Sequence, residues 1–214
     1  MHNRKINRVI IVGGGTAGWM TAAGLAAVLP VDDYDITLVE SEQIGTVGVG
    51  EATIPPIRLF NHNIGVSEEE FMRKTGATFK LGIEFHNWQR KGEHYFHPFG
   101  TYGRSLDSIP FHQYWLRAKS EGHATPWTDY SLCSLMARSK KFVQGSADTK
   151  SVLSTVGYAY HLDAGLYAKF LREFSEPKGV KRVEGKVIDV KFRSSNGHIE
   201  SVQLESSEII KGDF

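Results

Sequence analysis

The stretch that decides the fold runs from Asn7 to Gly18 and reads NRVIIVGGGTAG. Its first half, Asn7 to Val12, is short, β-branched and ended by glycine, which predicts a buried strand. Its second half is a G-x-G-x-x-G pattern, and the run from Ala17 to Leu29 behind it is apolar enough for a helix buried on more than one face. The first glycine makes a tight turn, the second lets the backbone approach a pyrophosphate, and the third lets the helix pack on the sheet. The candidate cofactor-binding residues of this turn are Gly13, Gly15, Thr16, Ala17 and Gly18, at the positive end of the helix dipole.

A second strand completes the unit. Ile36 to Val39 is apolar and is closed by Glu40. Strand, helix and strand in so short a span imply a right-handed parallel βαβ unit. An acid about 20 residues after the glycine turn accepts hydrogen bonds from ribose hydroxyls. The complete pattern favours dinucleotide binding over a purely structural turn, without separating FAD from NAD. Glu40 disfavours NADP, because it would repel the 2′-phosphate.

Length and composition set the class of protein. The chain has 214 residues, enough for one domain or for a domain and part of another. Its 41% hydrophobic and 23% charged residues are typical of a soluble globular protein. Lys and Arg number 25 against 24 Asp and Glu. This balance argues against a nucleic-acid binder that works by phosphate neutralisation and against a basic membrane-surface protein.

A cytoplasmic, metal-free protein is expected. Cys133 is the single cysteine, so an intramolecular disulfide or a cysteine-based zinc site is excluded. The apolar run Val9 to Val12 is too short for a signal-peptide core or a membrane span. His94 and His97 lie three apart beside Glu93, but aromatic residues interleave with them and no further ligand falls at helical spacing, so no metal is expected.

The remaining elements follow from local signals. Ser67 to Lys74 is predicted as a helix with Ser67 as N-cap, and Leu162 to Glu176 as a second helix with apolar residues every four positions. Asn196-Gly197 lies between two alternating runs, Lys186 to Phe192 and Ile199 to Leu204, and predicts a hairpin. The tail from Glu208 begins like another strand. Residues 44 to 60 are expected to be irregular.

Three further features carry candidate chemistry. Residues 48 to 55 read GVGEATIP, either a strap over a cofactor or an ordinary glycine loop, and composition alone favours the ordinary loop. Lys80 lies in an apolar stretch, where desolvation would lower its pKa and make it a candidate nucleophile or acid, although spacing alone favours a lysine that reaches solvent. The segment 79 to 130 holds 12 of the 24 aromatic residues, which indicates a flat-ligand pocket or core packing. His97 and Phe99 would share one face of an extended segment there and are able to sandwich an aromatic ligand.

Four of these segments resemble one family. VGGGTAGWM at 12 to 20, GVGEATIP at 48 to 55, FKLGIEF at 79 to 85 and YAYHLD at 158 to 163 are similar to the flavin-dependent tryptophan halogenases. The resemblance covers essentially the whole chain. It implies an α/β, Rossmann-like FAD-binding domain over residues 1–214, with a mixed sheet that contains the βαβ unit and a β-meander, and with a substrate-side insertion at about 79–130.

The resemblance also implies a reaction. Reduced FAD, delivered by a separate NAD(P)H-dependent flavin reductase, reacts with oxygen and with chloride or bromide to yield hypohalous acid. The oxidant then travels through a tunnel to tryptophan or another indole. The lysine that matches Lys80 holds or carries the halogen there, as a hydrogen-bonded acid or as a haloamine. General acid catalysis in a water-poor site is consistent with that role.

The family pattern assigns further residues. His97 and Phe99 match positions whose rings stack on the indole, and Glu51 lies where the strap links the flavin and substrate sites. Val187 matches a position whose backbone touches the adenine side of FAD. The strap residues implied in cofactor binding are Val49, Gly50 and Ala52.

Two other hypotheses about the function remain open. A flavin monooxygenase that transfers oxygen directly to an aromatic ring would need no lysine relay. A non-catalytic FAD-binding fragment is the third hypothesis, because the family's W-x-W-x-I-P segment, its second catalytic glutamate and its C-terminal helical part would all lie downstream of Phe214. The chain is expected to be truncated there, with an exposed sheet edge. Regioselectivity, halide preference and the oligomeric state, a homodimer included, are left open.

Overall fold

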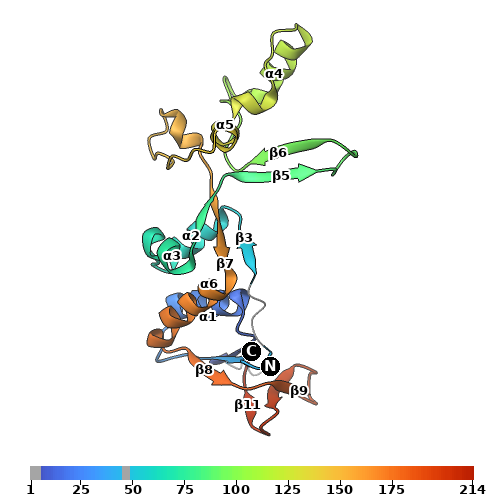
Figure 1. Cartoon of the computed structure of the whole chain (residues 1–214). Coiled ribbons are helices and arrows are strands. Elements are labelled where there is room, and N and C mark those ends of the chain that lie inside the picture. Colours follow the sequence, from blue (N-terminus) through green and yellow to red (C-terminus); the bar gives the residue numbers. More distant parts are fainter. Residues whose placement is uncertain (1–5, 45–48) are drawn as a thin grey trace. The chain divides into compact units, whose positions relative to one another are not determined.

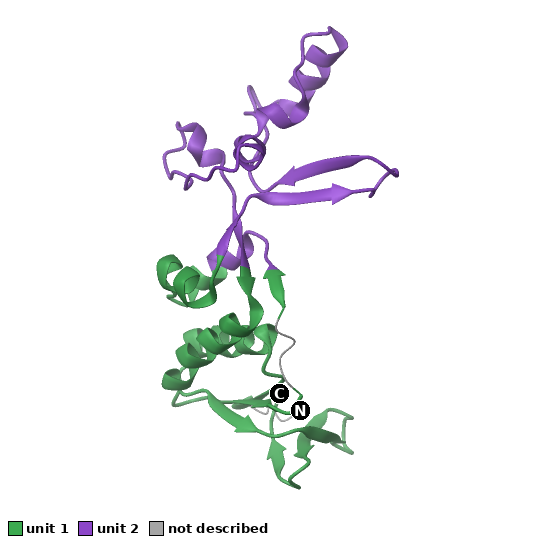
Figure 2. Ribbon diagram, in the orientation of Figure 1, with its two compact units in different colours: residues 1–51, 60–77, 162–214 green, residues 52–59, 78–161 purple. Residues whose placement is uncertain are grey.

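The computed structural model describes residues 6–44 and 49–214 (Figure 1). The chain divides into two compact units. The first unit comprises residues 1–51, 60–77 and 162–214, and the second comprises residues 52–59 and 78–161 (Figure 2). The predicted βαβ pattern therefore falls in the first unit, and the aromatic-rich segment falls in the second.

The first unit is built on a parallel sheet. Strand β1 (Arg8–Val12), helix α1 (Thr16–Val28) and strand β2 (Asp35–Glu40) form the predicted βαβ unit. Strands β1 and β2 pair in parallel from Arg8↔Asp35 to Val12↔Val39. Strand β8 (Lys181–Glu184) adds to the other side of β2, also in parallel. The α/β class and the βαβ unit are thus confirmed.

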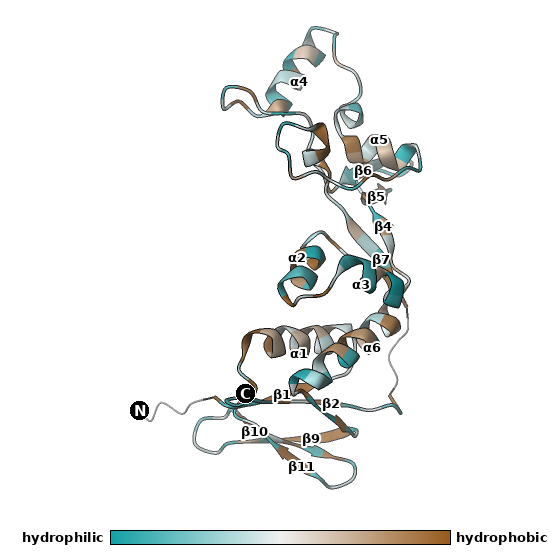
Figure 3. Cartoon of the chain, turned by 90° about the vertical axis from the view of Figure 1, so that its left-hand side faces the viewer, coloured by the Kyte–Doolittle hydropathy of each residue, from teal (hydrophilic) through white to brown (hydrophobic). Residues whose placement is uncertain are grey.

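Two helices cover one face of this sheet. Helix α1 and helix α6 (Ala164–Ser175) lie together over β1 and β2 (Figure 3). Ala22 and Ala23 of α1 are fully buried, and Trp19 is 1% exposed. Helix α6 begins at Ala164, two residues later than predicted, because residues 159 to 163 form strand β7 (Ala159–Asp163) and Asp163 then caps the helix.

The predicted meander lies on the opposite side of the parallel sheet (Figure 3). Strands β9 (Val187–Phe192), β10 (Ile199–Leu204) and β11 (Ile209–Lys211) pair antiparallel in a sheet of their own. The expectation of one mixed sheet is therefore wrong for the described residues. The hairpin is confirmed, but with a longer loop: Arg193 N–H donates to His198 at 2.7 Å and only Gly197 takes the left-handed conformation, with φ 72°.

The segment predicted as irregular contains two elements. Strand β3 (Gly50–Ala52) lies in the strap, and helix α2 (Pro56–Asn63) follows it with proline as its first residue. Helix α3 (Glu68–Thr75) confirms the predicted cap, since Ser67 Oγ accepts from Glu70 N–H. In the first-unit core, Tyr167 of α6 packs edge-on against Phe71 of α3, with ring centroids 5.2 Å apart.

The second unit combines short strands with helical turns. Besides the end of β3 and the first parts of α2 and β7, it contains β4 (Thr78–Lys80), β5 (Gly82–His86), β6 (His94–Pro98), α4 (Phe111–Ser120), α5 (Leu132–Arg138) and the 3₁₀ turns η1 (Trp127–Tyr130) and η2 (Val152–Thr155). Strands β4 and β7 pair antiparallel, as do β5 and β6, and β3 joins β7 in the order β3-β7-β4. A third 3₁₀ turn, η3 (Glu176–Lys178), follows α6 in the first unit.

Many aromatic side chains of the second unit pack on one another. Phe79 stacks on Phe142 with centroids 3.7 Å apart, and Tyr102 stacks on Trp127 at 4.5 Å. Core packing therefore accounts for part of the predicted aromatic segment. Across residues 6–44 and 49–214, the helices are all too short or too polar to cross a membrane.

Candidate functional site

The glycine turn has the geometry that its pattern predicts. Gly13 takes φ +113° and donates its N–H to Val39 at 2.8 Å, which ties the turn to β2. A side chain on Gly18 would clash with the carbonyl oxygen of Gly13, so the helix can pack here only with glycine. Nothing lies within 4 Å of the place where a Cβ of Gly15 would stand. Its backbone, at the N-terminus of α1, is therefore open to a ligand.

A cavity of about 350 Å³ opens above this turn. It brings together Gly13, Gly15, Glu40 and Val187, four predicted residues that come from three separate parts of the chain. Its complete lining is Val12, Gly13, Gly14, Gly15, Val39, Glu40, Ser41, Ile44, Gly185 and Val187. Thr16, Ala17 and Gly18 are not part of this lining.

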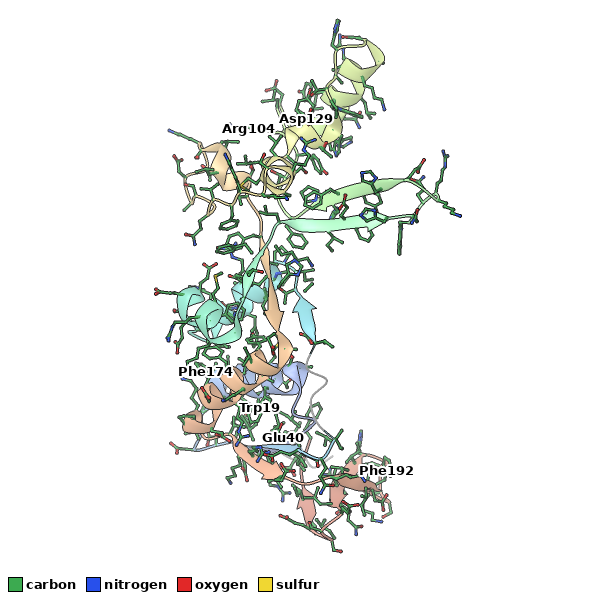
Figure 4. The ribbon with its side chains drawn as sticks, in the orientation of Figure 1. Trp19, Glu40, Arg104, Asp129, Phe174 and Phe192 are labelled. Atoms are coloured by element: carbon green, nitrogen blue, oxygen red, sulfur yellow. The ribbon has the colours of Figure 1, made fainter. Side chains whose placement is uncertain are left out.

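Glu40 is held by partners that the sequence analysis missed. Trp19 Nε1–H donates to Glu40 Oε2 at 3.3 Å, and Figure 4 shows these two side chains close together. Arg182 Nε–H donates to Glu40 Oε1. A side chain on Gly14 would overlap this carboxylate, so Glu40 lies directly over the glycine turn. The tryptophan of GGGTAGWM is the sequence signal for this contact.

The strap meets the start of two helices within the first unit. Ala164 N–H donates to the Val49 carbonyl at 3.1 Å, and Thr16 Oγ1–H donates to the Ala164 carbonyl at 3.4 Å. Ala164, which the sequence analysis did not single out, thus connects two predicted cofactor residues. Gly50 has open space where a Cβ would stand.

Two further strap residues lie on strand β3. Glu51 is half-buried and Ala52 is exposed, both on β3. Gly48 belongs to the predicted strap but lies outside the described residues.

In the second unit, Lys80 is buried, with only 8% of the residue exposed. Strand β4 alternates, so Phe79 points into the aromatic cluster and Lys80 points to the other face. Lys80 Nζ donates to the Thr53 carbonyl at 2.9 Å and lies 5.3 Å from the centre of the Phe99 ring, within the range of a cation–π interaction. The alternative of a lysine reaching solvent is wrong.

Thr53 ties the three motifs of this region together. Its N–H donates to the Tyr160 carbonyl at 2.9 Å, and Tyr160 N–H donates to Thr53 Oγ1 at 3.0 Å. Its carbonyl accepts from Lys80. The GEATIP, YAYHLD and FKLGIEF segments thus meet at Thr53 within the second unit, where its carbonyl holds the Lys80 ammonium.

The surroundings of Lys80 favour proton release. Desolvation lowers the pKa of Lys80, which agrees with the alternative that spacing alone did not favour. On the paired strand β7, burial and then the charge of Lys80 lower the pKa of His161. Among the described residues, no carboxylate lies in ion-pair range of Lys80. Lys80 is thus a stronger acid than an ordinary lysine.

His97 and Phe99 lie at the end of the β5-β6 hairpin. His97 is exposed and pairs with Ile83 across the hairpin, and Phe99 follows the strand and is half-buried against Lys80. His97 lies within β6, but the strand ends at Pro98 and Phe99 lies in the bend that follows, so the extended segment predicted to hold both residues stops before Phe99. Phe99 thus joins the Lys80 cluster through its ring, whereas His97 stands open to solvent.

The residues present fit the adenosine diphosphate part of a dinucleotide. The open backbone at Gly15 suits a pyrophosphate, the cavity suits an adenosine, and a carboxylate stands at its wall. Within residues 6–44 and 49–214, no three His, Cys, Asp or Glu side chains gather as metal ligands would.

Known proteins share this architecture. The family model for tryptophan halogenase matches residues 8–214. Tryptophan 6-halogenase SttH of Streptomyces toxytricini is 38% identical, over 100% of this chain and 44% of its own length. Xcc4156, a flavin-dependent halogenase from Xanthomonas campestris, matches with a TM-score of 0.90 at 44% identity, over 99% of this chain and 41% of its own. BrvH, a flavin-dependent halogenase from Brevundimonas sp. BAL3, matches with a TM-score of 0.88 at 42% identity, over 98% and 42%. The chain thus spans about two fifths of the length of these relatives.

Proposed function

The chain belongs to the tryptophan halogenase family, and from this premise we propose that it binds FAD in its first unit and uses Lys80 of its second unit to deliver halogen to an indole. The burial of Lys80, with its ammonium held between the Thr53 carbonyl and the Phe99 ring, is the observation that carries this proposal. Burying a lysine without a carboxylate partner costs folding free energy, and such perturbed groups cluster at functional sites.

The first unit would hold the cofactor by its adenosine diphosphate end. Gly13 and Gly15 would receive the pyrophosphate at the N-terminus of α1, and Glu40 would accept hydrogen bonds from the ribose. The backbone of Val187 would border the adenine side of the cavity. The strap residues Val49, Gly50 and Ala52 would complete the cofactor side. Reduced FAD, once bound, would supply with oxygen and chloride or bromide the oxidising equivalent for halogenation.

Lys80 would act on the halogen in either of two ways. As an ammonium it would donate a hydrogen bond to the oxygen of hypohalous acid, so that the arene carbon takes the halogen while the proton and hydroxide leave as water. As a neutral amine it would form an N–halogen bond, with water as the leaving product, and then transfer the halogen to the ring. Its lowered pKa supports both ways, since it strengthens the acid and increases the neutral fraction.

The substrate would be a flat aromatic molecule, tryptophan or another indole. Phe99 already packs against Lys80, and His97 is exposed two positions away. Rings at both positions would stack on the indole and present one of its carbons to Lys80, which would decide the site of substitution. Glu51 of the strap would contribute to the substrate side. A separate flavin reductase would supply the reduced cofactor.

Direct oxygen transfer to the ring is the weaker candidate. Direct oxygen transfer would give the buried Lys80 no role in the reaction. The relatives named above are halogenases rather than hydroxylases. We therefore expect halogenated and not hydroxylated products.

Mass spectrometry of products tests this proposal. The protein in its full-length form is supplied with a flavin reductase, FAD, NADH, oxygen, and chloride or bromide, together with a panel of indoles. We expect an indole in which halogen replaces one hydrogen. Hydroxylated indole as the only product would replace the halogenase with the monooxygenase.

A further inference from the structure

A group of charged side chains surrounds Glu40 on the side away from the glycine turn. Arg182 of β8 donates to Glu40 through Nε, and its Nη2 donates to Glu42 at 3.1 Å and to Glu184 at 2.5 Å. Arg172 of α6 lies 3.8 Å from the same Glu40 carboxylate. The hydrogen bond to Glu40 raises the pKa of Arg182, so its charge is permanent.

The Glu40–Arg182 pair is sheltered from solvent. The Glu40 side chain is 15% exposed and that of Arg182 is 14% exposed, whereas Glu42 is 78% exposed. A second cavity of about 280 Å³ lies behind the pair. Its lining includes Trp19, Glu40, Arg172 and Arg182, so the carboxylate forms part of the wall between the two cavities. A sheltered ion pair with a third hydrogen bond keeps a carboxylate in one orientation.

Trp19 and Arg182 each donate one hydrogen bond to a different oxygen of the Glu40 carboxylate. Oε2 accepts from Trp19 and Oε1 accepts from Arg182. A carboxylate has about four acceptor positions, so each oxygen keeps a lone pair for a ligand. Without these partners, Glu40 would be free to swing away from the glycine turn, and ordering it on binding would cost affinity.

We propose that Arg182 and Trp19 are positioning residues that hold the Glu40 carboxylate ready for the ribose hydroxyls of FAD. The inference rests on the proposed binding of FAD and adds the residues that make its ribose recognition specific. It explains why the glycine turn carries glycine at position 14 and is followed by tryptophan, since both contact the same carboxylate. Neither residue is expected to touch the flavin ring.

Calorimetric titration with ADP and with 2′,3′-dideoxy-ADP tests this role. For the unaltered protein in its full-length form we expect ADP to bind about 10- to 100-fold more tightly than the dideoxy analogue, the worth of hydrogen bonds to a charged group. In Arg182→Gln this ratio is expected to fall toward one, while binding of the dideoxy analogue stays unchanged. Arg182→Lys keeps the positive charge but loses the planar guanidinium, and its affinity ratio should fall between those of the unaltered protein and Arg182→Gln. Trp19→Phe should lower the ratio by a factor of a few.

The titration distinguishes a failure of the positioning role from a failure of the FAD site. An equal loss of affinity for both nucleotides in Arg182→Gln, or an unchanged ratio, would overturn the positioning role, and the Arg182→Lys variant guards against a mere folding defect. If the unaltered protein bound neither nucleotide, the proposed FAD site itself would fail. Arg117→Gln, which breaks an exposed ion pair with Glu121 in the second unit, is the control and should leave the ratio unchanged.

Discussion

Lys80→Ala is expected to abolish halogenation while oxidation of reduced flavin by oxygen continues. The change removes the ammonium from between the Thr53 carbonyl and the Phe99 ring. Loss of a general acid at the reacting group costs a factor on the order of 10²–10⁴ in rate. The measurement is product analysis by mass spectrometry together with peroxide release, because an oxidising equivalent that is not passed on ends as hydrogen peroxide.

Two variants make that result interpretable. Lys80→Met keeps most of the side-chain volume in the buried site but cannot donate a proton or bind halogen, so it should behave like Lys80→Ala. Lys119→Ala is the matched control, since Lys119 also lies over an aromatic ring of the second unit, 4.8 Å from Trp115, but is exposed. Halogenated indole at the normal rate in Lys80→Met would show that Lys80 is not the relay.

Gly15→Val is expected to weaken FAD binding strongly while the protein stays folded. The backbone at Gly15 is extended, with φ −76° and ψ −177°, which valine adopts without strain. The space beside it is free of protein atoms within 4 Å, and this is where the pyrophosphate would approach. We expect an affinity loss of about 100-fold or more, which corresponds to some 3 kcal/mol, and a smaller loss for Gly15→Ala.

The third glycine of the pattern provides the contrasting case. A Cβ on Gly18 would clash with the Gly13 carbonyl, so Gly18→Ala should lower the melting temperature of the FAD-free protein. Gly15→Ala should leave that temperature nearly unchanged. If Gly15→Val bound FAD as well as the unaltered protein does, the pyrophosphate would not lie at this turn.

Local patterns predicted the first unit well. Strand, glycine turn, helix and strand follow one another within residues 8 to 40, and the signals for each element lie inside that element. The cap at Ser67 and the β9-β10 hairpin were predictable for the same reason. Strand β3 was missed because three residues carry too little periodicity, and it exists through its pairing with β7. Helix α2 was missed although Pro56 is a favourable first helical residue.

The partners of the site residues were beyond local reasoning. Glu40 was correctly placed at the end of β2, but Arg182 lies 142 residues away in the sequence and reaches it only because β8 adds to β2. Thr53 contacts Tyr160 across 107 residues. Lys80 was singled out by its apolar neighbours, and its burial depended on the pairing of β4 with β7. Such contacts arise from sheet order, which a single sequence does not encode locally.

The most direct measurement is a titration of the unaltered, full-length protein with FAD and, in parallel, with FMN, followed by flavin absorbance and fluorescence. The cofactor would be recognised through its adenosine diphosphate end, at the glycine turn and Glu40, and FMN lacks that end. We therefore expect one equivalent of FAD to bind at least about 100-fold more tightly than FMN. Equal affinity for the two flavins, or no uptake of FAD, would contradict the account.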